Sequence, residues 1–143
     1  MPLTRKRIIY DRSGEKPYMI RRHLIFREKS EHLEKNVKVP FNAYIHKILL
    51  SDEPILHDHP WNWGTFIISG GYYEHTPDGT FWRAPGTWRT QKSTELHWLE
   101  LNENKPCYTL FWHGARSRTW GFQTDNGWTD YRTFLQNRLE SRT

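Results

Sequence analysis

Two histidines, His57 and His59, are the residues of this sequence whose spacing best fits a chemical task. One residue separates them, so both imidazoles point to the same face if the chain is extended there. Two neutral imidazoles on one face provide half of a first-row transition-metal site. An aromatic and β-branched run follows and ends at Gly70-Gly71, a tight-turn signal. The pattern predicts a metal-binding pair that leads into a strand.

Most of the chain consists of short strand-forming stretches with turn signals between them. Turns such as Pro77-Asp78-Gly79 and Asp125-Asn126-Gly127 are typical of hairpins. The expected strands cover residues 7–10, 18–26, 43–50, 64–68, 72–76, 81–83, 88–91, 95–101, 107–113 and 120–124. Short strands at this spacing, without alternating helices, predict a sandwich or barrel and argue against a parallel α/β fold.

Two further segments are expected to differ from the strands. Residues 28–38 are highly charged and fit either a short exposed helix or a solvated loop. Asp130 is a suitable N-cap for a terminal helix over about residues 131–139. The 143 residues suit one domain, with N-terminal strands at 7–26, a core at about 43–124 and this helix.

Side-chain alternation assigns an inner face to two of the strands. Over residues 43–50, Tyr44 and His46 share a face, whereas Lys47 lies on the opposite face and indicates solvent there. His46 is therefore expected to point inward, more often as a hydrogen-bonded core residue than as a ligand. By the same alternation His97 shares an inward face with Leu99.

Composition limits the function without fixing it. The chain has eight Trp, seven Tyr and seven Phe, more aromatic side chains than its core requires, so some are expected to line a cavity. A net charge of +5, with basic residues mainly near the ends, fits an anionic ligand, weak nucleic-acid binding or solubility alone. Cys107 is the only cysteine, which excludes an intramolecular disulfide. No secretory signal or membrane span is recognisable, so a cytoplasmic location is expected.

The histidine pair and the glycines after it resemble the first motif of the cupins, which are small double-stranded β-helix barrels. That motif has a glycine, five residues, His-x-His, three or four residues, a glutamate, six residues and a closing glycine. His57 and His59 fill the His-x-His, and Gly70 or Gly71 fits the closing glycine. The glutamate position falls on Trp63 or Gly64, and the opening glycine position on Ser51.

The second cupin motif is similar to the segment from Gly86 to His97, which keeps the offset of eleven residues between its glycine and histidine. The internal Pro and Gly positions and the closing Asn position hold other residues. The resemblance, over about residues 50–101, implies an all-β double-stranded β-helix, the cupin or jelly-roll barrel, with a short C-terminal helix. It also implies a three-histidine site of His57, His59 and His97 for a divalent transition metal such as iron, zinc, nickel or manganese. The alternative is a metal-free barrel in which these histidines are polar core residues.

Without the glutamate the site would leave the charge of a divalent metal uncompensated, which favours an anionic ligand. Candidate groups around it fall into two sets. Glu74 and Arg83 are the candidate catalytic residues, although Glu74 also fits an exposed strand carboxylate. The candidate pocket residues are Trp61, Trp63, Tyr73, Arg89, His113 and His46. Arg83 and Arg89, if inward, would clamp a carboxylate or phosphate.

The resemblance implies a metal-dependent small-molecule enzyme, with an oxygenase ahead of an isomerase. Some cupin thiol dioxygenases use a three-histidine iron site, and the likeness to them is in the ligand set only. Two alternatives stay open: a non-catalytic cupin that binds a small anionic or sugar ligand, and a nucleic-acid-associated protein whose basic ends hold phosphates. No membrane partner is expected, and a homodimer is compatible with either reading.

Overall fold

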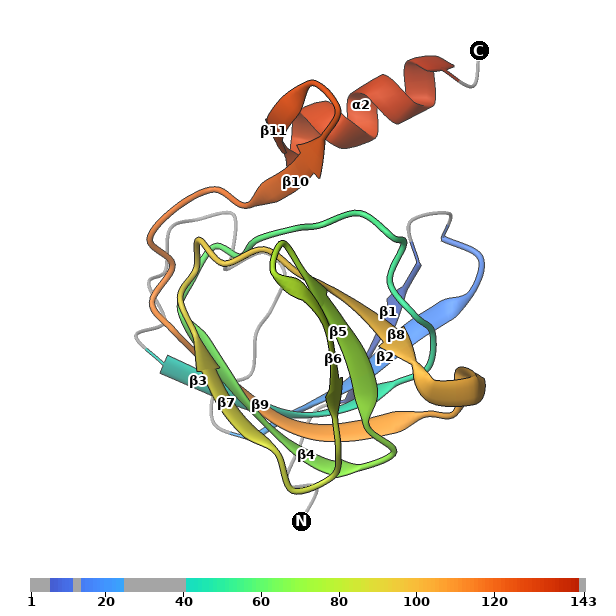
Figure 1. The fold of residues 1–143 in the computed structure, drawn as a ribbon, viewed down its shortest axis with the longest axis vertical. Helices are drawn as coiled ribbons and strands as arrows, with labels where there is room; N and C mark the ends of the chain where they lie inside the picture. Colours follow the sequence, from blue (N-terminus) through green and yellow to red (C-terminus); the bar gives the residue numbers. More distant parts are fainter. Residues whose placement is uncertain (1–5, 12–13, 25–40, 142–143) are drawn as a thin grey trace.

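Antiparallel strand pairing organises the chain into a barrel-like arrangement of a six-stranded and a three-stranded sheet, with a separate two-stranded sheet near the C-terminus (Figure 1). The structure is a computed structural model that describes residues 6–11, 14–24 and 41–141. The charged segment 28–38, for which a helix or a loop was expected, lies outside the described residues. Within the described part the pairing confirms the all-β sandwich or barrel expected from the strand pattern, and the jelly-roll form that the cupin resemblance implied.

The larger sheet has six strands in the spatial order β1-β2-β3-β9-β4-β7. Their bounds are Lys6–Tyr10 for β1, Pro17–His23 for β2, Phe41–Ile48 for β3, Cys107–Gly114 for β9, Trp63–Ser69 for β4 and Trp88–Gln91 for β7. The smaller sheet has the order β6-β5-β8, with bounds Gly79–Arg83, Tyr72–Thr76 and Trp98–Leu101. A short 3-10 turn, Asn102–Asn104, leads from β8 toward β9.

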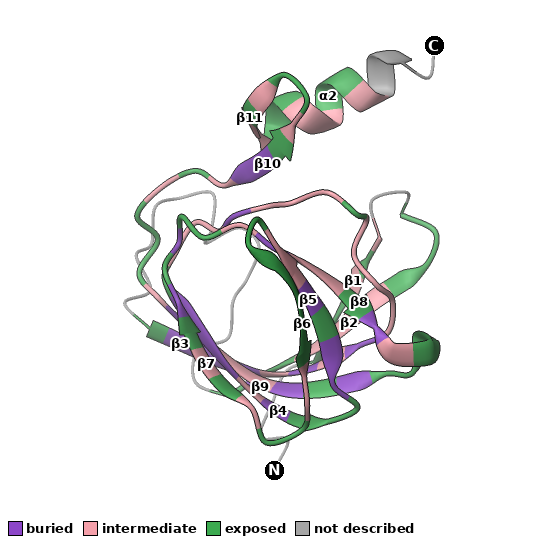
Figure 2. Ribbon diagram, viewed as in Figure 1, coloured by how far each residue is buried: buried purple, intermediate pink, exposed green. Residues whose placement is uncertain are grey.

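The inner faces of the two sheets meet in a small core. Along β3 the burial alternates, with Tyr44, His46 and Ile48 buried, as the alternation predicted (Figure 2). The apolar cluster consists of five buried residues, Ile48, Ile67, Tyr72, Leu101 and Cys107. Much of the remaining interior is polar or aromatic, so the barrel holds a site as well as a core.

Tight packing fixes the turn between β4 and β5. Gly70 and Gly71 both have positive φ, 90° and 77°, a conformation that glycine adopts without strain. A Cβ at Gly70 would lie 2.4 Å from the carbonyl oxygen of Pro106. The glycine pair is therefore required both by the backbone conformation and by the close approach of the chain before β9.

A C-terminal unit lies at one end of the barrel (Figure 1). It comprises β10 (Gly121–Thr124), β11 (Gly127–Asp130) and α2 (Tyr131–Ser141). The expected helix is present and begins after Asp130, whose carboxylate accepts the backbone N–H of Thr133 at 2.9 Å. The sequence prediction missed β11, because its four residues directly follow the turn and precede the helix cap. It also began β8 three residues too early.

Tryptophan is mostly a boundary residue in this fold. All eight tryptophans lie in the described part of the chain, and only Trp63 is buried there. Trp88 is 64% exposed on the outer face of the larger sheet. Trp61, Trp63 and Trp120 line an internal cavity, as the excess of aromatic residues predicted. No helix among the described residues combines the length and apolar character needed to cross a membrane.

The buried thiol of Cys107 is expected to be unreactive in the folded protein. Burial raises its pKa to about 11, so the thiolate fraction near pH 8 is reduced by about 100-fold relative to an ordinary cysteine. Alkylation by iodoacetamide, followed by mass spectrometry, should be at least that much slower in the native protein than in guanidinium chloride. Similar rates in the two conditions would contradict the placement of Cys107 in the core.

Candidate metal centre

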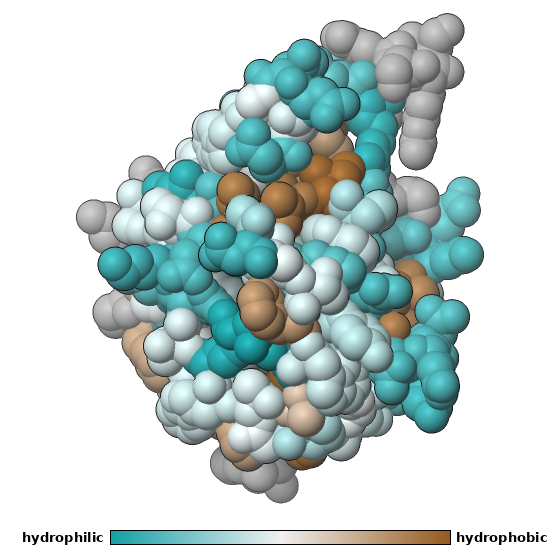
Figure 3. All heavy atoms as spheres, in the orientation of Figure 1, coloured by the Kyte–Doolittle hydropathy of each residue, from teal (hydrophilic) through white to brown (hydrophobic). Residues whose placement is uncertain are grey.

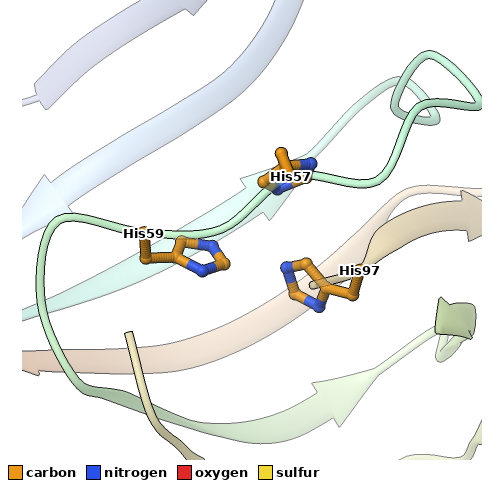
Figure 4. A group of neighbouring side chains, drawn as sticks. All are labelled: His57, His59 and His97. Atoms are coloured by element: carbon orange, nitrogen blue, oxygen red, sulfur yellow. The ribbon is translucent and has the colours of Figure 1, made fainter. Parts of the chain in front are cut away.

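Three histidines from two segments face one another inside the barrel (Figure 4). His57, His59 and His97 each offer a ring nitrogen, and these nitrogens all lie within 4.8 Å of one another. The ring centroids of His57 and His59 are 5.2 Å apart, and His97 is 4.9 Å from each. These three residues form the only cluster of this kind in the described part of the chain.

Backbone pairing brings the two segments together. His57 and His97 exchange both N–H to carbonyl hydrogen bonds, each of 2.9 Å. Upstream, Ser51 Oγ accepts the N–H of Leu101, and Asp52 Oδ2 accepts the N–H of Leu99, both at 2.8 Å. Ser51 occupies the opening glycine position of the cupin motif, and here its hydroxyl helps to fix the register of β8 against the histidine segment.

The residue between the two histidines anchors the C-terminal unit. Asp58 is 2% exposed, and its carboxylate accepts hydrogen bonds from Gly121 N at 2.7 Å and Trp128 Nε1 at 2.9 Å. Arg118 pairs with the same carboxylate at 2.8 Å. Asp58 thus contacts three residues of the segment 118–128 and ties the C-terminal unit to the histidine segment. Because Asp58 points away from its neighbours' imidazoles, it fixes the backbone from which His57 and His59 project.

A buried carboxylate holds the third histidine. Glu74, on β5, is 1% exposed, and its Oε2 lies 2.7 Å from Nδ1 of His97. Its Oε1 accepts from Arg83 Nε at 3.0 Å and lies 3.3 Å from Arg89 Nη2. A carboxylate on the far nitrogen of a histidine fixes the ring and raises its basicity, as at many metal sites. Glu74 is therefore buried rather than exposed on its strand, and it contacts His97 rather than the cluster centre.

The protonation states suit metal binding. Burial acts to raise the pKa of Glu74, but the hydrogen bond from His97 and the two arginines outweigh it and lower that pKa below its ordinary value. The ionised Glu74 accepts the hydrogen bond of Nδ1 of His97, so Nε2 is the nitrogen of that ring available to a metal. Burial, followed by the neighbouring His97 and His57, lowers the pKa of His59 well below its ordinary value. His59 is therefore neutral, as a ligand must be.

Two observations bear on whether the cluster fits a metal ion. Nδ1 of His59 is buried without a hydrogen-bond partner among the described residues, and a metal ion is one way to satisfy such an atom. Trp63 stands at one of the two positions that the motif offers for the glutamate ligand. Its ring centroid is 5.0 Å from His59 and 5.1 Å from His97. An apolar ring thus lies beside the imidazoles where a carboxylate would otherwise approach.

The cluster opens into a cavity of about 450 Å³, called here the aromatic cavity. Its walls near the histidines include Trp61, Trp63, Phe111 and Trp120. Its only lysine or arginine in the described part is Arg21, whose Nε donates to His46 Nε2 at 3.0 Å. Burial, followed by Arg21, lowers the pKa of His46 well below its ordinary value, so His46 is a neutral member of the wall.

Not all of the expected pocket residues meet in this cavity. Trp61, Trp63 and His46 line it, whereas Arg83 and Arg89 lie with Glu74 along a second cavity. His113 is buried behind the wall, with Nε2 2.7 Å from the hydroxyl of Tyr44 and its ring stacked on Trp61. Tyr73 is 36% exposed on the outer face of β5, where it packs on Trp82, because its neighbours Tyr72 and Glu74 take the inner face. The structure therefore does not bring Tyr73 to either cavity.

Sequence reasoning missed three residues that shape the site. Asp58 was expected only as the spacer between two histidines, although an acid at a buried position requires a specific partner. Arg21 lies on the inner face of β2, and the alternation of that strand could have indicated it. Tyr18 also lines the aromatic cavity and donates its hydroxyl proton to Asp52.

Several of the basic residues near the chain ends serve the fold. Arg118 pairs with Asp58, and Arg138 of α2 donates to Glu53 Oε1 at 2.6 Å. Arg5 and Arg142 lie outside the described residues. The engaged arginines have less freedom to hold phosphates than the sequence indicated, and nucleic-acid binding stays an untested expectation.

Comparison with known proteins gives a likeness of fold. No family model and no curated protein matches the sequence. A solved cupin-2 domain from Rhodospirillum rubrum is 13% identical, with 98% of this chain and 90% of that chain covered and a TM-score of 0.63. An RmlC-like cupin protein from Ralstonia eutropha is 10% identical, covers 96% and 81%, and has a TM-score of 0.57. A polyketide cyclase from Streptomyces resistomycificus is 17% identical, covers 70% of each chain, and has a TM-score of 0.52. The structural likeness confirms the expected barrel. At such low sequence identity it shows the fold alone.

The three histidines are expected to act as a unit. Replacing any one of His57, His59 or His97 by Ala should lower bound metal about as much as replacing all three, because two imidazoles hold a divalent ion weakly. Metal content would be measured by mass spectrometry after identical loading. His46→Ala and His113→Ala are the matched controls and should retain the metal, since both rings lie outside the cluster. A full equivalent in the His97 variant, with loss in a control, would refute this ligand set.

Glu74→Gln is expected to weaken metal binding by about 10- to 100-fold, the usual effect of losing a carboxylate behind a ligating histidine. The change keeps the size of the side chain but removes the charge that orients His97. Zinc affinity would be measured by competition with a chromophoric chelator. Glu100→Gln removes an exposed carboxylate of the same sheet, which pairs with His75, and it should leave the affinity unchanged. Equal losses in the two variants would mean that Glu74 acts only through stability.

Proposed function

We propose that this chain, whose fold is that of the cupins, is a metal-dependent enzyme acting on a small anionic molecule, an oxygenase ahead of an isomerase. One observation carries the proposal: three imidazole nitrogens within 4.8 Å of one another open into an aromatic cavity of about 450 Å³. Three imidazoles leave open positions on a metal for a substrate or co-substrate. A cavity of that size suits a small molecule.

The charge of the site supports an anionic substrate. His57, His59 and His97 add no negative charge when neutral, so a bound divalent ion would retain its full charge toward a ligand. The four acidic residues of the wall are engaged with the protein. Asp11 accepts from Glu15 N, Asp52 from Leu99 N, Glu53 from Arg138, and Asp58 from Arg118. Arg21 adds a guanidinium on the same wall.

The wall also indicates the body of the substrate. Trp61, Phe111 and Trp120 present apolar rings and exclude water from the space above the imidazoles. Their contacts favour a substrate with an apolar or aromatic body, and Arg21 would orient its anionic end. The substrate class is therefore an apolar molecule with one carboxylate or comparable oxyanion.

An oxygenase is favoured over an isomerase because the cavity lacks an evident proton-transfer residue. An isomerase usually needs a base with a pKa near the working pH. Asp52 and Asp58 are committed to hydrogen bonds, and the lowered pKa of His46 makes it a weak base. A redox-active metal such as iron would instead supply dioxygen chemistry, and the chain would bind the substrate, orient it and keep water out. The polyketide cyclase with the same fold supports enzymatic activity in general.

The test is oxygen uptake by the full chain loaded anaerobically with iron(II). A panel of small aromatic carboxylates and thiol carboxylates would be added in air and followed with an oxygen electrode. We expect one class to consume oxygen at least tenfold faster with the wild-type chain than with His57→Ala. The His113→Ala variant, which leaves the cluster intact, should retain most of the rate.

Two results would contradict the oxygenase proposal. Oxygen uptake of equal rate in His57→Ala would assign the reaction to free iron. Turnover of the substrate without oxygen, by protein loaded with manganese or zinc, would favour the isomerase.

A further inference from the structure

A second cavity of about 480 Å³ lies along the open seam between the edge strands β6 and β7. It is called here the seam. It shares Trp63 and His97 with the wall of the aromatic cavity but holds Arg83 and Arg89 instead of the aromatic rings. In Figure 3 strongly hydrophilic atoms gather in the middle of the face where Figure 1 shows these two strands. The proposed function makes no use of this cavity.

The two arginines meet across the seam at one carboxylate oxygen. Arg83 of β6 donates Nε to Glu74 Oε1 at 3.0 Å, and Arg89 of β7 places Nη2 3.3 Å from the same atom. One buried carboxylate thus faces two guanidinium groups. The side chains of Arg83 and Arg89 remain 18% and 24% exposed, so both reach the seam itself.

Donors remain available on both side chains. The terminal nitrogens of Arg83 have no hydrogen-bond partner among the described residues, and its guanidinium lies 4.9 Å from the ring centroid of Phe81. The Gln91 amide is oriented so that its nitrogen donates to Glu95. In this orientation its oxygen accepts from Nε of Arg89 at 3.1 Å. Nη1 of Arg89 has no partner among the residues described. Glu74 and Phe81 therefore fix the position of the Arg83 fork while its outer edge stays open.

Charge and geometry together select the ligand. Two planar guanidinium forks on opposite walls match the oxygen atoms of a carboxylate or phosphate. Asp78 and Glu95 also line the seam, but both are exposed, and Glu95 accepts the Gln91 amide in the arrangement above. Solvent screens the charges of Asp78 and Glu95, so their repulsion of an anion is weaker than the attraction of the less exposed Arg83 and Arg89.

We propose that the seam is a second ligand site, which binds a small oxyanion, either a carboxylate or a phosphate, between Arg83 and Arg89. The site is separate from the aromatic cavity and does not require the metal. It has one connection to the histidine cluster, because the same Glu74 that holds both arginines also holds His97. If His97 ligates a metal as in the proposed function, an anion that draws either arginine away from Glu74 alters the hold on that ligand.

The test is isothermal titration of the metal-free full chain with inorganic phosphate and, separately, with succinate. Metal-free protein removes any anion binding by a metal ion, so failure here is distinct from failure of the proposed function. We expect saturable binding of at least one anion at low salt. Arg83→Gln and Arg89→Gln should each weaken it by tenfold or more, and the preferred anion identifies the source of the oxyanion. Arg132→Gln, an exposed arginine of α2, is the matched control and should change the affinity less than twofold.

Lysine variants separate the fork geometry from the charge and guard against misfolding. Arg83→Lys and Arg89→Lys keep the positive charge at Glu74, and we expect intermediate affinities with an unchanged circular dichroism spectrum. Binding that is equal in the wild type and all four variants would overturn the proposal, as would no binding of either anion by the folded wild-type chain. Loss of equal size in Arg132→Gln would also overturn it, since the effect would then follow net charge alone.

For the connection to the cluster, zinc affinity would be measured with and without a saturating concentration of the preferred anion. We expect a change of at least threefold in the wild type and none in Arg83→Gln. An unchanged zinc affinity in the wild type, with anion binding intact, would remove the connection through Glu74.

Discussion

The backbone pairing of His57 with His97 is the contact on which the rest of the site depends. It joins the histidine segment to the end of the smaller sheet, and Ser51 and Asp52 extend the same register to β8. Because alternate residues on paired strands share a face, this single register places all three imidazoles on one side. A slip of one residue would turn the ligands outward, so the side-chain hydrogen bonds that fix the register serve the chemistry directly.

The pair His57 and His59 was predictable because its signal is local, whereas the third ligand, His97, followed from the resemblance to the second cupin motif. Strand alternation puts both residues of a His-x-His pair on one face, and it separately gave His97 an inward position. The strands and the C-terminal helix were predictable for the same reason. The strand β11 was not, because four residues between a turn and a helix cap carry too short a pattern.

The groups around the cluster were harder to place, since their roles depend on which strands become neighbours. Glu74 contacts His97 only because β5 pairs with β8 and the inner face of β5 includes position 74. Arg83 was expected as a catalytic residue and Arg89 as a pocket residue, but both line the seam and not the aromatic cavity. The sequence indicates what such residues can bind, whereas the order of strands decides where they bind it.

The three residues from His57 to His59 have two separate structural roles. The neighbours of Asp58 face inward as candidate ligands, while its own carboxylate faces the opposite way and anchors Gly121, Arg118 and Trp128. The spacing of the histidines is therefore under double constraint. A lineage that lost the metal would still have to keep the length of this segment to retain its C-terminal unit. The one-residue spacing can thus outlast the chemistry, and a His-x-His remnant with one histidine replaced is the trace that such a loss would leave.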